Sequence, residues 1–532
     1  MRNRFTLRFL AGLALFALNF SRQKIPLISS ISLLIPTFNL HNGYPGCPRL
    51  IARIRDIRFR NQPINKANTK TMGNDNSKSR RSFITNVTKG MIGATMLPSI
   101  ITSRDRKKNM QALFRPQKDY AANDQLQIAL IGSGGMGVAD TNTAITVPGI
   151  KLMAVCDLYD GRLSEARKRW GNDIDTTRDY REILDRKDID AVIIATPDHW
   201  HRDISVAAMN KGKHVYCEKP MVHDISEGSS VVDAQKKNKV VFQVGSQGLS
   251  SLGNEKAKQL LKEGAIGKLN YAEGFWARMS PTGAWQYPIP ADASPSTVDW
   301  DRFVANTNKR PFDPLRFFRW RNYRDYGTGV SGDLFVHLFS SLHFVTGSIG
   351  PNKVMATGGL RYWKDGREVP DIMLGMFDYP ESEAHPAFNL SLRVNFVDGT
   401  GGTNYLRMVG SEGSMTVEWD KVTLYKNKST EDANDPLLKT KNNTPAGKEY
   451  VYERKTMLPP DNLVYTAQEG YKGAHFDHFY NWATPIRNKT DVTENSLFGY
   501  RAAAPALLCN DSYFSNRIVQ WDPQNLKLVA TK

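Results

Sequence analysis

The residues best suited to chemistry begin with a glycine-rich loop that could bind the phosphates of a dinucleotide. It directly follows the apolar, strand-like run Leu126–Ile131 and precedes a helical pattern. The first glycine would permit a tight turn, the second would let the backbone approach a pyrophosphate, and the third would let the helix pack closely on the strand. The loop consists of Gly132, Ser133, Gly134, Gly135, Met136 and Gly137.

An acidic residue follows where it could bind a ribose. Asp157 ends a second strand, Lys151–Cys156, and lies 20 residues after Gly137. A carboxylate there would accept hydrogen bonds from the ribose hydroxyls of NAD and repel the 2′-phosphate of NADP. NAD is therefore the predicted cofactor, and NADP is less favoured. A glycine-rich surface turn and a helix-capping aspartate are the structural alternatives.

Polar residues also follow two later strands, Asp190–Ala195 and His214–Cys217. Strands and helices alternate through this region, which predicts an α/β fold with a doubly wound parallel sheet of the Rossmann type. Because ligands of such sheets lie beyond the carboxyl ends of the strands, these residues should meet the glycine loop in one crevice. The cofactor-binding residues predicted after the two strands are Thr196, Pro197, His199, His201, Glu218 and Lys219.

With these features, the chain from Gln125 onward resembles the Gfo/Idh/MocA oxidoreductases. The resemblance rests on the glycine loop, on Glu218-Lys219-Pro220 after a strand, and on Asp333 followed four residues later by His337. It implies that Lys219 lies near the nicotinamide and polarises the reacting hydroxyl, and that His337 is the acid/base.

The chemistry implied for these side chains is physically reasonable. An imidazole can exchange the hydroxyl proton near neutral pH, and an ammonium stabilises a developing alkoxide. Asp333 lies one helical turn before His337, so it could orient the substrate or the imidazole. A solvated lysine at a strand end and a histidine in the core are the alternatives.

The segment Phe275–Val330 departs from a compact member of that family. It lengthens the stretch from Lys219 to Asp333 to 114 residues and is rich in aromatic residues and arginine. Such side chains suit the faces and hydroxyls of a sugar ring, although a loop packed on the second sheet is the alternative. The start of the Asp333 helix is less well defined, because its glycine-rich approach matches the family only in part. The predicted substrate-binding residues are Trp285, Arg321, Tyr323 and Tyr326.

The remainder predicts a C-terminal α+β domain, residues 248–532, after a Rossmann domain at 121–247. Apolar residues alternate in several segments, which predicts a mostly antiparallel sheet with one face free for contacts in a homo-oligomer. The polar stretch Lys426–Lys448 suggests a loop, and the helices expected near the end are His475–Pro485 and Leu497–Ser512. The predicted strands are Leu269–Trp276, Lys353–Tyr362, Ile372–Tyr379, Asn389–Phe396, Tyr405–Gly410 and Ser414–Trp419.

The charge of the chain is concentrated before the predicted Rossmann domain. The formal net charge is +18, of which residues 1–71 carry +11 and residues 72–120 carry +7, so the remaining chain is balanced. This distribution argues against nucleic acid as a partner, because no basic surface would remain on the folded body. The four cysteines contain no Cys-x-x-Cys pair, so no metal site is predicted.

The leader resembles an export signal. Ser79–Ile84 contains the pair Arg80-Arg81 and precedes a weakly apolar run, a pattern typical of a twin-arginine signal. Residues 72–120 are therefore expected to be a signal and linker read by the twin-arginine machinery, with a periplasmic destination. Residues 1–71 are either an over-annotated start or an N-terminal membrane anchor.

Three functions remain open at this point. The first is an NAD(P)-dependent oxidoreductase that transfers a hydride to or from a hydroxyl carbon of a sugar or glycoside. The second is an NAD-dependent glycoside hydrolase that works by transient oxidation and elimination. The third is a non-catalytic sugar-binding protein, because a fold alone does not choose among functions.

Overall fold

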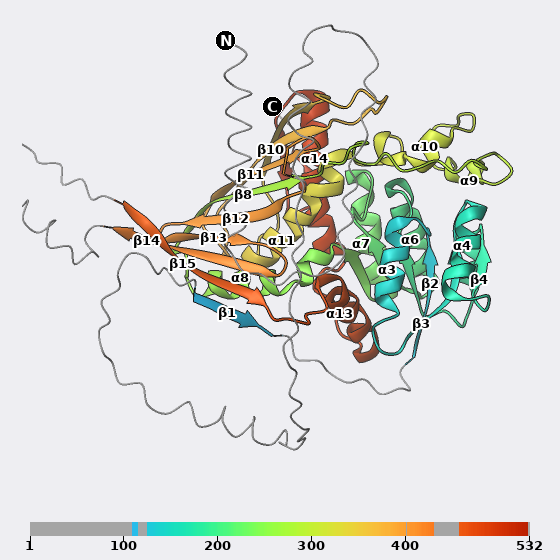
Figure 1. The fold of residues 1–532 in the computed structure, drawn as a ribbon, viewed down its shortest axis with the longest axis horizontal. Helices are drawn as coiled ribbons and strands as arrows, with labels where there is room; N and C mark the ends of the chain where they lie inside the picture. Colours follow the sequence, from blue (N-terminus) through green and yellow to red (C-terminus); the bar gives the residue numbers. More distant parts are fainter. Residues whose placement is uncertain (1–108, 115–124, 401, 430–456, 530–532) are drawn as a thin grey trace, which may run out of the picture. The chain divides into compact units, whose positions relative to one another are not determined.

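The computed structural model describes residues 109–114, 125–400, 402–429 and 457–529 (Figure 1). The predicted twin-arginine signal and the segment before it lie outside these residues, as does most of Lys426–Lys448. None of the helices in the described ranges is long and apolar enough to cross a membrane.

The first sheet has the predicted Rossmann arrangement. Its strands follow the order β4-β3-β2-β5-β6-β7, and every neighbouring pair is parallel. The chain leaves β2 for β3 on one side and later returns to β5 on the other, which creates the switch point where such sheets bind ligands. The strands are β2 Leu126–Ile131, β3 Ile150–Cys156, β4 Asp175–Thr177, β5 Ala191–Ile194, β6 His214–Glu218 and β7 Phe242–Gly245.

Helices cover both faces of this sheet, as the uniformly buried residues of β5 require. One covering helix, α13, comes from the far end of the chain and packs beside α3 (Figure 1). On α13, Phe479 stacks on Tyr216 of β6 at 4.4 Å between ring centroids, and the Trp482 indole donates a hydrogen bond to the Val215 carbonyl. The helices are α3 Gly135–Ala144, α4 Asp160–Trp170, α5 Tyr180–Asp185, α6 His201–Asn210, α7 Gly228–Asn238 and α13 Ala474–Asn488.

The second sheet is mostly antiparallel, as predicted. Within the described residues its order is β1-β15-β14-β13-β12-β8-β11-β10-β9-β16-β17, and only the pairs β1–β15 and β8–β11 are parallel. Its strands are β1 Asn109–Leu113, β8 Leu269–Ala277, β9 Lys353–Gly359, β10 Ile372–Tyr379, β11 Phe388–Asn395, β12 Asn404–Gly410, β13 Gly413–Val417, β14 Lys421–Ser429, β15 Met457–Ala467, β16 Val519–Asp522 and β17 Lys527–Leu528.

One face of this sheet packs on helices, and the other is open. In β10, Phe377 is buried against Phe339 of α11, whereas Leu374 and Met376 are exposed. This alternation is the two-residue period of a strand with one covered face. Contacts of a homo-oligomer through the open face stay a prediction. The helices beneath the sheet are α8 Leu252–Lys262, α11 Val336–Thr346 and α14 Ser496–Ser515.

The prediction of a loop at Lys426–Lys448 is wrong for its first residues, Lys426–Ser429. Residues up to Ser429 belong to β14, which pairs with β13 and β15. Val422 and Leu424 are the buried positions of this strand, so its apolar signal is short. Strand β1 was not predicted; it comes before the Rossmann sheet in the chain but pairs with β15 in the second sheet.

Residues 285–326, here called the covering segment, lie over the Rossmann domain instead of packing only on the second sheet. The backbone carbonyl of Phe303, in this segment, accepts hydrogen bonds from the Trp200 indole and from the His199 ring, each at 3.0 Å. Tyr159 pairs with Val298 and donates its hydroxyl to Asp292 at 2.5 Å. The segment contains α9 Trp300–Phe303, α10 Pro314–Phe318 and the short helix η4 Trp320–Asn322.

A turn of π-helix, η5 Ser331–Phe335, precedes α11. Gly332 is required there, because a Cβ at this position would lie 2.1 Å from the Thr328 hydroxyl oxygen. Asp333 therefore lies in a widened turn, and His337 is the second residue of α11. The regular α-helical turn expected between these two residues is replaced by a junction of two helix types.

Candidate active site

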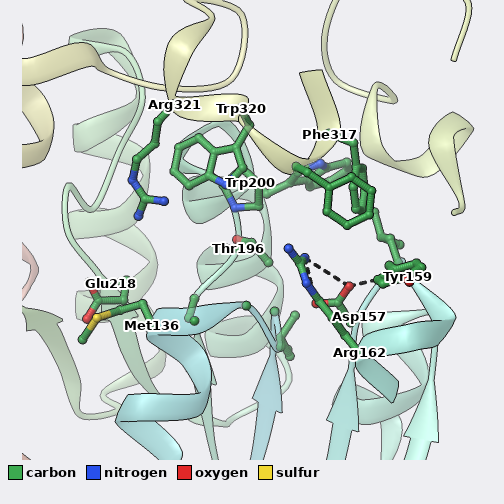
Figure 2. Close-up of a pocket in the computed structure, with 18 of the residues that line it drawn as sticks. Met136, Asp157, Tyr159, Arg162, Thr196, Trp200, Glu218, Phe317, Trp320 and Arg321 are labelled. Atoms are coloured by element: carbon green, nitrogen blue, oxygen red, sulfur yellow. Dashed lines mark hydrogen bonds and ion pairs between the residues drawn. The ribbon is translucent and has the colours of Figure 1, made fainter. Parts of the chain in front are cut away.

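A cavity of about 730 Å³ lies at the carboxyl ends of the Rossmann strands. Gly132 after β2, Asp157 after β3, Thr196 after β5 and Lys219 after β6 all line it. The covering segment supplies the opposite wall, where Figure 2 shows Phe317, Trp320 and Arg321 facing the strand ends. The structure thus brings the predicted strand-end residues together in one crevice.

The glycine loop has the shape that a pyrophosphate needs. Gly132 has φ +97°, and a Cβ there would lie 2.6 Å from the carbonyl carbon of Ala195. A Cβ on Gly137 would lie 2.0 Å from the Gly132 oxygen, so this glycine allows close packing and does not itself line the cavity. At Gly135 no atom would lie within 4 Å of an added Cβ, which leaves the N-terminus of α3 open to an anion. The loop therefore fits a dinucleotide.

Replacing Gly137 by alanine is expected to lower the free energy of unfolding by about 1–3 kcal/mol, because the backbone must shift away from the new methyl group. The same shift should weaken NAD binding. Gly135→Ala is the matched control, since its methyl group meets nothing and alanine favours a helix. Thermal unfolding and NAD titration of both variants test this, and equal stability of the two would contradict it.

Asp157 is held in place directly after β3, where the sequence predicts a ribose. Its carboxylate accepts hydrogen bonds from the backbone N–H groups of Ser133 at 2.8 Å and Tyr159 at 3.0 Å. Arg162 forms an ion pair with it at 3.4 Å (Figure 2). Tyr159, and not Asp157, is the N-cap residue of α4, so the capping alternative does not describe this aspartate.

Four arginines line the same end of the cavity, and each has a carboxylate partner. A 2′-phosphate would have to compete with these acids for the guanidinium groups. The pairs are Arg162–Asp157, Arg178–Asp160, Arg181–Asp179 and Arg302–Asp299.

Glu218, the last residue of β6, also lines the cavity and directly precedes Lys219. Its carboxyl accepts a hydrogen bond from the Gln247 amide at 2.6 Å, and burial raises its pKa to about 7. Burial and the neighbouring Glu218 also raise the pKa of Asp140 well above its ordinary value. A buried carboxyl with a pKa near neutrality beside a ligand cavity is typical of functional sites.

Lys219 and Asp333 form a buried ion pair. The Lys219 ammonium donates to the Asp333 carboxylate at 2.8 Å and to the Asp333 backbone carbonyl at 2.6 Å. Arg321 donates to the same carboxylate oxygen at 3.3 Å. Burial would raise the pKa of Asp333, but Lys219 and Arg321 hold it well below its ordinary value. The carboxylate thus remains ionised and fixes both cations at the cavity.

His337 presents a neutral imidazole to the cavity. Its ring stacks on Trp276 with centroids 5.0 Å apart, and its Nδ1 is buried without a hydrogen-bond partner among the described residues. Burial, followed by the positive charge of Lys219, lowers its pKa well below the ordinary value. The described hydrogen bonds of the Asp333 carboxylate go to Lys219 and Arg321 and not to this imidazole, so the expected orientation of the ring by Asp333 is not found.

Most of the predicted cofactor and catalytic residues line the cavity, but His199 and His201 do not. His201 uses both ring nitrogens on backbone carbonyls, at 2.7 Å from Pro220 and 2.8 Å from Thr196. His199 is turned to the Phe303 carbonyl. Both are buried and hold loops together. Those that do line the cavity are Gly132, Gly134, Gly135, Met136, Asp157, Thr196, Pro197, Glu218, Lys219, Asp333 and His337.

Of the predicted substrate-binding residues, only Arg321 lines the cavity. Trp285 packs on Phe396, with ring centroids 4.9 Å apart. Tyr326 is fully buried in the aromatic cluster of the covering segment, and the Tyr323 ring faces the Arg316 guanidinium. These three side chains therefore pack against other parts of the protein and do not face the cavity.

The inner end of the cavity instead has aromatic walls that the prediction did not select. Trp276 at the end of β8 could have been found from its alternation with Ala272 and Gly274, which are also buried. Trp419 ends a predicted strand and His475 begins a predicted helix, and no local signal places either residue at the cavity. Trp276, Arg278, Tyr287 and Trp320 belong to the segment Phe275–Val330 that the sequence indicated, although they were not among the four selected residues, and Trp419 and His475 were missed.

Comparison with known proteins supports the Rossmann domain most directly. Residues 126–246 match the model of the Gfo/Idh/MocA oxidoreductase family, described by its NAD-binding Rossmann fold. The levoglucosan dehydrogenase of Pseudarthrobacter phenanthrenivorans is 28% identical over 242 residues, which is 44% of this chain and 54% of the relative. The inositol 2-dehydrogenase of Salmonella paratyphi B is 32% identical over 145 residues, 27% of this chain and 43% of that protein. The chain thus spans about half the length of the curated relatives it matches.

The solved structures extend the likeness in fold to the second sheet. A levoglucosan dehydrogenase in complex with NADH and levoglucosan has a TM-score of 0.53 and 19% identity, covering 74% of this chain and 99% of that one. The parallel sheet, its glycine loop and the family match together show that residues 126–246 are similar to the NAD-binding Rossmann domain of the Gfo/Idh/MocA oxidoreductase family.

Proposed function

We propose that this protein is an NAD-dependent oxidoreductase that transfers a hydride between nicotinamide and a hydroxyl-bearing carbon of a sugar. The observation that carries the proposal is that one cavity contains the glycine loop, Lys219 and His337. The relatives named as levoglucosan and inositol dehydrogenases support a cyclic polyol or sugar as the substrate.

Different side chains of the cavity can transfer the hydroxyl proton and stabilise the negative charge on the reacting oxygen. A bound nicotinamide would supply the hydride acceptor or donor. The Lys219 ammonium, positioned by Asp333, can donate a hydrogen bond to the reacting hydroxyl and stabilise negative charge on its oxygen. The neutral imidazole of His337 can accept the hydroxyl proton and return it in the reverse direction.

The aromatic walls suit the same substrate class. Trp276, Trp320, Tyr287 and Trp419 line the inner cavity. Aromatic faces bind the apolar C–H faces of sugar rings while leaving the hydroxyls free for polar partners.

Product analysis separates this function from its two rivals. The protein is incubated with NAD and a panel of sugars and glycosides, and both reduced nicotinamide and released aglycone are measured. Oxidation of a free hydroxyl supports the proposal. Glycoside cleavage without net reduction of NAD would support the hydrolase, and binding without turnover of any ligand would support the sugar-binding protein.

NAD is expected to bind more tightly than NADP, because Asp157 stands at the ribose position and the neighbouring arginines are already paired. Asp157→Ser should weaken NAD binding and bring the dissociation constants of NAD and NADP closer together. Dissociation constants of both cofactors with both proteins test this. Equal or tighter binding of NADP to the unchanged protein would contradict the assignment.

We also propose export in folded form, based on the twin arginines in the sequence. Replacing Arg80 and Arg81 by lysine should abolish the periplasmic fraction of the protein in its native host. Fractionation followed by immunodetection measures this. An unchanged periplasmic yield would point to another route or to the apolar stretch Leu7–Phe20 near the start of the sequence as the signal.

A further inference from the structure

We propose that the sugar bound here carries an anionic group, a carboxylate or a phosphate, and that Arg278 binds this group. The proposal rests on the proposed function of the cavity and adds a substrate class to it.

Arg278 lies beside the residues expected to perform the chemistry. It follows directly on β8, and its backbone N–H donates to the Asn395 carbonyl at 3.0 Å, which continues the pairing with β11. Two residues before it, Trp276 stacks on His337. Because side chains two residues apart on a strand share a face, Arg278 is on the cavity side, and it lines the cavity.

The guanidinium of Arg278 lacks the partner that the other cations of the cavity have. Within the described part of the chain, its side chain makes no hydrogen bond or ion pair. Lys219 and Arg321 are both bound to Asp333. The four arginines at the ribose end are each paired with an aspartate.

The inner end of the cavity therefore has an excess of positive charge. Lys219, Arg321 and Arg278 surround one carboxylate, Asp333. Glu218 compensates only in part, because burial brings its pKa to about 7 and its carboxyl is already bound to Gln247. Partly desolvated cations without a counter-charge favour an anionic ligand, and the planar guanidinium matches a carboxylate or phosphate with two parallel hydrogen bonds.

The phosphates of the cofactor have a different place in the fold. They are expected at the glycine loop, where the N-terminus of α3 is open. Arg278 directly follows β8 of the second sheet, two residues after the Trp276 ring that stacks on His337, where the substrate is expected. Its unpaired charge is thus available to the substrate.

Ligand binding to the NAD-saturated protein tests this without requiring turnover. The probes are D-glucuronate, D-glucose 6-phosphate and D-glucose, and titration calorimetry gives the dissociation constants. At least one anionic sugar should bind about tenfold or more tightly than glucose, and Arg278→Gln should remove that preference while leaving glucose binding nearly unchanged. The two anionic probes distinguish a carboxylate from a phosphate. Arg517→Gln is the matched control, because Arg517 is exposed and lies outside this cavity.

Three results would overturn the proposal: equal or tighter binding of glucose, failure of both anionic sugars to bind, or a preference that survives in Arg278→Gln. Oxidation of the same sugars is followed in parallel. Oxidation of glucose with no preference for charge would overturn the anion site and keep the proposed function. An anion preference that depends on Arg278, without oxidation of any sugar, would support the site and count against the proposed function.

Discussion

Replacing His337 by glutamine is expected to lower kcat by about 10²–10⁴-fold, the usual effect of removing a general acid/base. The imidazole lines the cavity, lies against Trp276, and has an Nδ1 with no hydrogen-bond partner in the part of the chain that the structure describes. NAD binding should persist, because His337 belongs to α11 and not to the glycine loop. Steady-state kinetics combined with NAD titration measures both effects.

His343→Gln is the control for this substitution. His343 is also buried in α11, but its Nε2 forms a hydrogen bond with the Tyr379 hydroxyl at 2.9 Å, and it does not line the cavity. This variant should retain turnover per folded molecule. If His337→Gln kept full turnover on a true substrate, the proton would have to be carried by another group, and the proposed role would be wrong.

The same histidine predicts a pH profile. Burial and Lys219 lower the pKa of His337, so the ring stays neutral, and able to accept a proton, at pH values below its ordinary pKa of about 6.5. Oxidation should therefore lose activity only as pH falls through this lowered pKa. In Lys219→Met the positive charge is gone, and the acid limb of kcat/KM should move to higher pH.

Replacing Lys219 by methionine is expected to lower turnover by about 10²–10³-fold, because a charged hydrogen-bond donor at the reacting oxygen is lost. It also leaves the buried Asp333 carboxylate with Arg321 as its remaining partner. Loss of one partner from a buried ion pair destabilises a protein by up to about 3–5 kcal/mol. Kinetics and chemical denaturation measure the two effects separately.

A double variant separates chemistry from stability. Lys219→Met combined with Asp333→Asn also removes the buried carboxylate that lost its lysine partner, so stability should recover in part while turnover stays low. Lys213→Met serves as a control, because Lys213 is a buried lysine that donates to the carbonyls of Arg186 and Ile189 away from the cavity. It should lose stability and keep turnover. Recovery of turnover in the double variant would contradict a direct role for Lys219.

The Rossmann domain could be predicted closely because its signals are local. Buried parallel strands are continuous apolar runs, and the run Leu126–Ile131 coincides with β2. In the second sheet, β10 also has the predicted bounds, Ile372–Tyr379, because one face alternates clearly. The end of β14, Lys426–Ser429, was mistaken for a loop, because polar residues on an open face resemble those of a turn.

The sequence predicted which residues at the strand ends belong to the site, but it did not predict the contacts between distant segments that complete it. The approach of Lys219 to Asp333 joins residues 114 apart, and no pattern in either segment encodes it. His199 and His201 were predicted to contact the cofactor because they follow a strand, but backbone carbonyls of other loops bind their rings. Trp419 and His475 reach the cavity only because the second sheet and α13 pack beside the Rossmann domain.

The most direct test of the proposed activity follows the hydride itself. The protein is incubated with NAD and sugars deuterated at their hydroxyl-bearing carbons, and the nucleotide is analysed by mass spectrometry. Deuterium should appear in the nicotinamide with the unchanged protein and be greatly reduced with His337→Gln. If a deuterated sugar is bound or converted and the nucleotide never gains deuterium, hydride transfer is not the function of this cavity.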